Sequence, residues 1–153
     1  MRINFSKAVS IVCDEPYRLF FPLGILIGFI GAGHWLFYTV GWSSSYSGLF
    51  HSLIQTQGYM ICFVIGFLMT AMPRLSSTAH ASIREVGSAF LLICAIVGFL
   101  AVHLWIWAEL GFIALLLAFV RFAFVRISRR NPSHVPPVEF VWIPIAILHG
   151  LVG

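Results

Sequence analysis

Long uninterrupted apolar runs are the feature that most constrains this chain, and the run over residues 51–73 is the most informative of them. A segment of about 20 apolar residues crosses a bilayer as a helix, because a helix pairs its own backbone hydrogen-bonding groups. The composition agrees, since 60% of the residues are hydrophobic and only 9% are charged, unlike a soluble domain. The runs are also too continuous for the alternating strands of a membrane barrel. We therefore expect an all-α fold, a polytopic transmembrane helical bundle.

Five transmembrane spans account for the apolar runs. They are expected over residues 18–40, 50–72, 86–105, 108–128 and 138–153. Residues 1–16 come first, and their apolar spacing predicts a short helix in the membrane interface, ended by Pro16. The last run rises only about 24 Å, less than the ~30 Å hydrocarbon core. We expect residues 1–153 to be one transmembrane domain, the N-terminal fragment of a longer protein, with the C-terminal half or a second subunit as its partner.

The basic residues predict the orientation of the bundle. All nine Lys and Arg residues fall on the same side of the five expected spans, and the expected turns at 41–49 and 105–109 carry none. The positive-inside rule then places the N-terminus in the cytoplasm of a multi-pass protein of the inner (plasma) membrane. The net charge of +4 therefore reports topology, and we expect no nucleic acid partner.

A polar stripe begins the second expected span. At 3.6 residues per turn, one helix face carries His51, Gln55, Gly58, Cys62, Ile65 and Met69. One interpretation is a cofactor-binding face, because His51 offers an axial imidazole and Gly58 leaves room for a flat ring. The other is a helix-packing face, since small and weakly polar residues commonly form contacts between membrane helices. The spacing alone leaves both open.

Four histidines are expected at one depth in the membrane. The topology places His34, His51, His103 and His149 in the outer half, on four different spans. Histidine inside a membrane is costly and usually has a partner or a function, and neutral imidazole is the commonest side-chain ligand for transition metals. These four are therefore candidate metal ligands, and the alternative is that they bond to headgroups or to each other.

Gly24 and Gly28 form a GxxxG pattern in the first expected span. Missing side chains at this spacing let two helix backbones approach closely. We expect this face to contact the second span.

Three stretches resemble the start of NnrS proteins: YRLFFPLGIL (17–26), FHSLIQTQGY (50–59) and GFLMTAMPRL (66–75). NnrS proteins are polytopic membrane proteins described as binding haem and copper and linked to nitric oxide metabolism. Their pattern reads roughly W-H-x-H-E-M-x-x-G-F, followed by G-F-L-x-T-A-x-P. The resemblance implies a similar fold and a similar cofactor for this chain.

The resemblance also extends to individual residues. His51 stands at the first histidine of the family pattern, and Gly58 and Tyr59 keep its glycine–aromatic pair. Leu53 and Ile54 stand where the family has its second histidine and its glutamate. The resemblance therefore implies haem held by His51 and a copper site weakened by Leu53 and Ile54. The stripe adds Gln55 and Gly58 as candidate cofactor-binding residues beside His51.

Two classes of function compete with the haem hypothesis. In that hypothesis the protein acts in nitric oxide or respiratory stress metabolism, with a second ligand from His34, His103 or His149. The alternatives are a cofactor-free transporter or channel whose histidines line a polar path, and a structural membrane subunit. A visible absorption spectrum separates haem binding from both. The residues assign no catalysed reaction.

Overall fold

The computed structural model describes residues 5–129 and 142–152, and within these ranges the chain contains helices and no strand. The elements in chain order are α1 (Phe5–Asp14), α2 (Tyr17–Thr39), α3 (Gly48–Leu53), the π-helix η1 (Ile54–Met60), α4 (Ile61–Ser76), α5 (Ile83–Ala101), α6 (Trp105–Ser128) and α7 (Trp142–Val152). Because α3, η1 and α4 follow one another directly, residues 48–76 form one continuous helix. The expected all-α fold is confirmed.

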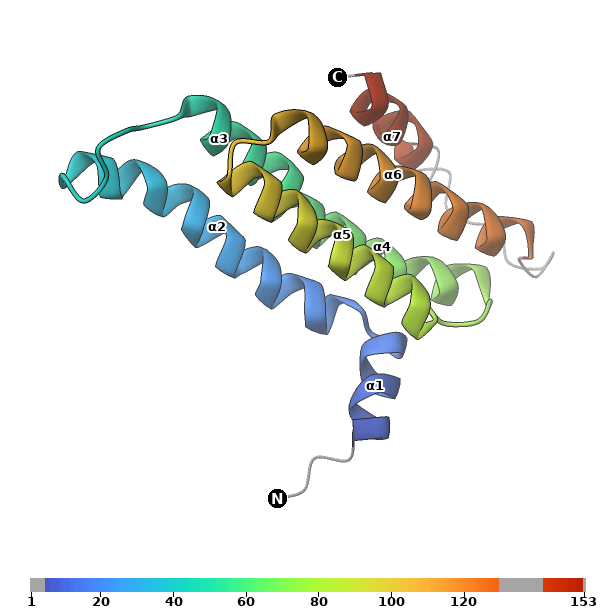
Figure 1. The fold of residues 1–153 in the computed structure, drawn as a ribbon. Coiled ribbons are helices and arrows are strands. Elements are labelled where there is room, and N and C mark those ends of the chain that lie inside the picture. The colour runs from blue at the N-terminus through green and yellow to red at the C-terminus, as the bar shows by residue number, and fades with distance from the viewer. Residues whose placement is uncertain (1–4, 130–141, 153) are drawn as a thin grey trace.

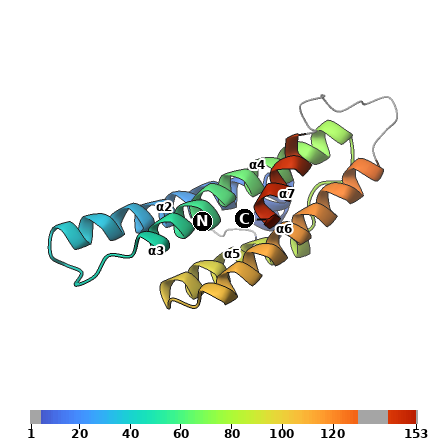
Figure 2. The same cartoon turned by 90° about the horizontal axis from the view of Figure 1, so that it is seen from above.

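The long helices lie side by side in a bundle, as Figures 1 and 2 show. α2 packs against η1 and α4, α5 packs against α6 and η1, and α6 also contacts α4. The shorter α7 lies against α6, and α1 stands at an angle to the bundle (Figure 1). The 48–76 helix is therefore central, because it contacts both α2 and the α5–α6 pair.

Four helices of the described chain are long and apolar enough to cross a membrane: residues 17–39, 48–76, 83–101 and 105–128. They agree with the first four expected spans to within a few residues. In the fifth, residues 138–141 and 153 lie outside the described residues, and α7 covers only Trp142–Val152. The number of spans and the cytoplasmic N-terminus therefore stay predictions.

Apolar side chains divide between a helix-packed core and an outer belt. Ile93, Ile96 and Leu100 on α5 are fully buried, whereas Phe29 on α2 is 72% exposed and Ile106 on α6 is 75% exposed. Large exposed apolar surfaces mark contact with a membrane or a partner. The outer surface of this bundle is that of a protein surrounded by lipid.

The reversal between the third and fourth spans lies earlier than expected. It falls at residues 102–104, and Trp105 to Glu109 form the first turn of α6 rather than a loop. His103 takes a left-handed conformation with φ +59°, and the N–H of Leu104 donates to the carbonyl of Phe99 at 2.8 Å. This pairing ends α5 sharply, so the following residues are free to begin the next helix.

The second expected span also ends later than Pro73. The helix continues through Pro73 to Ser76 and ends where Ser77 takes a left-handed conformation with φ +51°. The N–H of Thr78 then donates to the carbonyl of Pro73 at 2.9 Å. Proline removes only one helical hydrogen bond, and the left-handed cap sets the end of the helix instead.

Candidate functional site

Glycines on α2 form a smooth surface for the 48–76 helix. A Cβ atom placed on Gly28 would lie 2.6 Å from Cδ2 of Tyr59, and one on Gly24 would lie 2.9 Å from Cβ of Cys62. Gly31 is equally tight, at 2.8 Å from a methyl carbon of Ile54. These separations are too short for a side chain, so the expected close contact between the first two spans is confirmed.

The polar stripe of the second span passes through the π-helix η1. Its backbone bonds skip one residue more than α-helical bonds, as where the N–H of Ile61 donates to the carbonyl of Thr56. The first part of the stripe contacts α2, through His51, Gln55, Gly58 and Cys62. Ile65 and Met69 instead line a hollow against α5 and α6. The predicted face therefore holds from His51 to Cys62 and does not extend to Ile65 and Met69.

His51 is half-buried between α3 and α2. Its Nδ1 lies 2.9 Å from the carbonyl oxygen of Gly31. A carbonyl only accepts, so Nδ1 carries the proton and Nε2 carries the lone pair. Among the described residues, Nε2 has no hydrogen-bond partner. Metal-ligating histidines characteristically donate the second ring N–H to a carbonyl, carboxylate or water, so His51 presents an imidazole in the form that ligation requires.

His34 lies near His51, but its ring already bonds to the loop that precedes α3. Its Nε2 accepts a hydrogen bond from the backbone N–H of Ser47 at 3.0 Å. The ring stacks on Tyr46 with centroids 5.3 Å apart and meets the edge of Phe50 at 4.9 Å. Tyr46 also lies 6.4 Å from the ring of His51. In this geometry His34 fixes the 40–47 loop onto α2, with its acceptor nitrogen already used.

The other two candidate histidines lie apart from this pair. His103 is exposed in the turn before α6, where its ring meets the edge of Trp105 at 5.1 Å. His149 is exposed on α7. Across residues 5–129 and 142–152, no group of three or more His, Cys, Asp or Glu residues could hold a metal ion. The four histidines thus share no common centre in the described chain.

Gln55 and Gly58 lie in different surroundings. Gln55 lines a surface groove of about 370 Å³ between α2 and η1, together with Gly28, Ala32 and Tyr59. Gly58 is buried against α2 as well, where a Cβ atom would lie 2.7 Å from a methyl carbon of Ile27. Ile27 therefore fills the space that Gly58 leaves, and the groove is the open surface beside Gln55.

Gln57 and Glu109 form a polar pair that sequence reasoning missed. Gln57 is only 6% exposed, and its Nε2 donates to Oε1 of Glu109 at 2.8 Å. Oε1 of Gln57 is buried without a hydrogen-bond partner in the described structure. The available signal was an amide in the middle of an apolar run. The sequence does not indicate the π-helix, so the inward direction of the Gln57 side chain was not predicted. Glu109 was expected in a turn between two spans.

The fold and the site together define a class: a polytopic α-helical membrane protein with a ligation-competent histidine between its first two long helices. A family model described as NnrS protein matches residues 11–153. The chain belongs to the NnrS family and is thus a nitric oxide-related membrane protein. Neither the curated proteins nor the solved structures contain a match.

Proposed function

We propose that this chain binds haem through His51 and acts in nitric oxide and respiratory stress metabolism in the inner (plasma) membrane. The observation that carries the proposal is the hydrogen bond from Nδ1 of His51 to the carbonyl of Gly31 at 2.9 Å. It fixes the tautomer and leaves Nε2 as the free donor atom. Family membership supports the same proposal, because the resemblance described above sets His51 at the first histidine of the family pattern.

The residues around His51 fit such a group. Gly31 orients the imidazole, and Gln55, one turn further on, lines the groove against Gly28 and Ala32 with Tyr59. An apolar wall with few polar groups is typical of a cofactor site. When bound, haem would supply a redox-active iron that can take a small ligand. The chain itself contributes a positioned imidazole and, beside Gln55, an apolar groove surface.

The described residues do not fit a copper site. Leu53 and Ile54 provide no ligand atoms beside His51, and no suitable group of three ligands is present in the described ranges. We therefore derive no step through copper. His34, His103 and His149 remain candidate second ligands, and His34 would first have to release the N–H of Ser47.

An absorption spectrum of the purified full chain tests the proposal. We expect a haem Soret band in the wild type, its loss in His51→Gly, and its return when free imidazole is added to that variant. His80→Ala is the matched control, because His80 is an exposed histidine between α4 and α5, and it should keep the band. Full haem occupancy in folded His51→Gly protein without imidazole would falsify the assignment. A colourless wild type would favour a cofactor-free transporter.

A further inference from the structure

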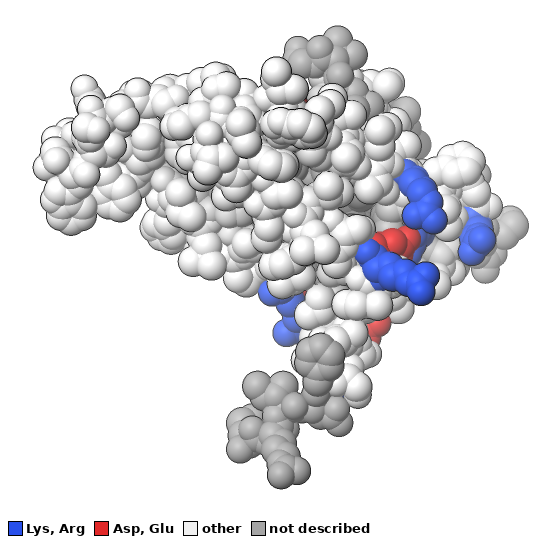
Figure 3. Space-filling model, in the orientation of Figure 1, with Lys and Arg blue, Asp and Glu red and all other residues white. Residues whose placement is uncertain are grey.

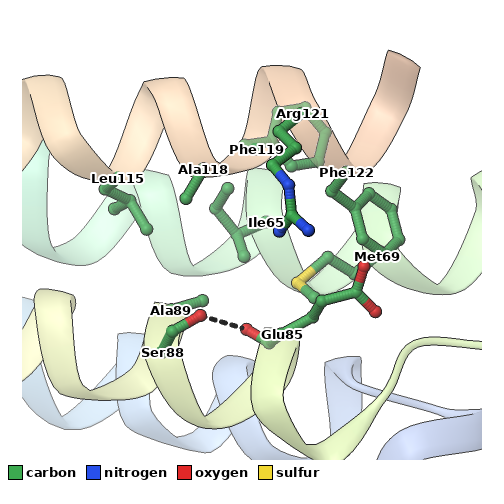
Figure 4. Close-up of a pocket in the computed structure, with 10 residues that line it drawn as sticks. All are labelled: Ile65, Met69, Glu85, Ser88, Ala89, Leu115, Ala118, Phe119, Arg121 and Phe122. Atoms are coloured by element: carbon green, nitrogen blue, oxygen red, sulfur yellow. Dashed lines mark hydrogen bonds between the residues drawn. The ribbon is translucent and has the colours of Figure 1, made fainter. Parts of the chain in front are cut away.

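A hollow between α4, α5 and α6 has an apolar floor and contains Arg121, a cation that is not paired with any described residue. Met69, Leu115 and Phe119 contribute to the floor, and Arg121 extends from α6 into the space above Glu85 and Ser88 (Figure 4). The hollow measures about 40 Å³. It lies near the end of the bundle where α5 begins and α6 ends.

Glu85 is the acidic residue that lines this hollow, but both oxygens of its carboxylate already accept hydrogen bonds. Both of its oxygens accept from the guanidinium of Arg126, and the Nη2–Oε2 distance is 2.8 Å. Oε2 also accepts from the backbone N–H of Ser82 at 2.8 Å, within the capping box that begins α5. Arg126 is buried, donates to the carbonyl of His80 and lies 3.8 Å from the ring centroid of Phe122. Glu85 therefore neutralises Arg126.

Arg121 has no ion pair or hydrogen bond to any described residue. It lies seven residues before the end of α6 at Ser128, a depth of about 10 Å along the helix. Other acids are engaged elsewhere: Glu15 pairs with Arg18 and Arg74, and Glu109 bonds to Gln57 near the start of α6. A cation at this depth is stabilised by an anionic partner, and no described residue provides one.

The surroundings of Arg121 are basic. Figure 3 shows Lys and Arg side chains gathered at one end of the bundle, with Asp and Glu atoms among them, whereas the rest of the visible surface carries no charged side chain. The arginines nearest the ends of these helices are Arg74 on α4, Arg84 on α5, and Arg121, Arg126 and Arg129 at or beside the end of α6. Basic pockets between membrane helices commonly bind the headgroups of anionic lipids. The charge of this end therefore complements a phosphate group.

We propose that the hollow binds the phosphate of an anionic phospholipid, with Arg121 as the direct donor. The guanidinium provides up to five N–H groups in a fixed planar arrangement that suits two phosphate oxygens. The acyl chains of the lipid would continue along the apolar surfaces of α5 and α6, where Leu91 and Phe124 are 67% and 68% exposed. This site is independent of His51 and of haem.

Lipid-dependent stability of the full chain tests the proposal. The protein in mixed micelles is titrated with phosphatidylglycerol, phosphatidylcholine or inorganic phosphate, and the unfolding temperature is followed together with bound lipid by native mass spectrometry. We expect phosphatidylglycerol to raise the unfolding temperature and to be retained, whereas the other two have little effect. Arg121→Gln should weaken phosphatidylglycerol binding roughly fivefold, the value of about one surface charge.

Three controls define the outcomes. Lys7→Gln removes an exposed basic residue of α1 and should keep the lipid response. Arg121→Lys keeps the charge without the planar donor and should show an intermediate response, which also serves if Arg121→Gln does not fold. An unchanged phosphatidylglycerol response in Arg121→Gln overturns the proposal. An equal effect of inorganic phosphate would show that the ligand is free phosphate rather than a lipid, and would also overturn the proposal.

Discussion

Gln57 of η1 donates a hydrogen bond through Nε2 to Oε1 of Glu109 on α6, across 2.8 Å. The two residues are 52 positions apart in the chain and belong to the second and fourth long helices. A side-chain bond between membrane helices adds polar specificity to an otherwise apolar contact. It therefore sets the relative rotation of η1 and α6.

Removing only one member of this pair should destabilise the bundle. Gln57→Leu leaves the Glu109 carboxyl without its donor, and losing a bond to a charged group costs about 1.5–3 kcal/mol. The double variant Gln57→Leu, Glu109→Leu should recover much of that loss, because neither polar group is then left unpaired. Thermal unfolding in detergent measures both effects. Additive losses in the double variant would show that the two side chains act independently.

Gly28→Leu should disrupt packing of the first two long helices. The new side chain would meet the ring of Tyr59, since even its Cβ would lie 2.6 Å away, and overpacking typically costs about 1–3 kcal/mol. Gly98→Ala is the matched control, because no atom lies within 4 Å of a Cβ there. The unfolding temperature and the yield of folded protein report the difference. Equal stability of the Gly28→Leu and wild-type proteins would contradict the close contact.

The tautomer of His51 is directly measurable. Because Nδ1 donates to the carbonyl of Gly31, we expect nitrogen chemical shifts of ¹⁵N-histidine-labelled, haem-free protein to assign the proton of His51 to Nδ1. His34 should show the same tautomer, since its Nε2 accepts from Ser47. Single His→Gln variants assign the signals. A proton on Nε2 of His51 would remove the main support for its proposed ligand role.

The junction of α1, α2 and α4 should depend on pH through Glu15. Hydrogen bonds from Arg18, and then from Arg74, hold the pKa of the Glu15 carboxyl below its ordinary value. A lowered folded-state pKa contributes stability above the unfolded value, and this contribution is lost as the pH falls through the folded value. Arg74→Gln should therefore raise the pKa of Glu15, measured by carboxyl ¹³C titration. Arg84→Gln is the control, and an equal shift in both variants would exclude a specific contact.

The orientation in the membrane stays a prediction that labelling can test. Ser45 and Ser77 are both exposed, one between α2 and α3 and the other after α4. Cysteines placed singly at these positions in a background without Cys13, Cys62 and Cys94 should react from opposite sides of intact membranes. We expect Ser77→Cys to react from the cytoplasmic side. Labelling of both from one side would require a different topology.

Hydropathy was sufficient to predict the long helices, because a segment surrounded by lipid must form its backbone hydrogen bonds within itself, as a helix does. The contact at Gly24 and Gly28 was also predictable from residue size alone. The direction of Gln57 was not, since no local pattern in residues 54–60 specifies a π-helix over an α-helix. The end of α5 depends on the left-handed conformation of His103, which residue type alone does not indicate.

Two contacts of the 48–76 helix depend on the number of residues between His51 and Gln57. His51 lies before η1 and bonds to α2, and Gln57 lies within η1 and bonds to α6. One residue of an α-helix corresponds to a rotation of about 100°. Deleting a residue between His51 and Gln57 would therefore turn one side chain away from its partner whenever the other stayed in place. An insertion or deletion there would therefore change the orientation of the His51 imidazole relative to its site, even though every ligand atom remained in the chain.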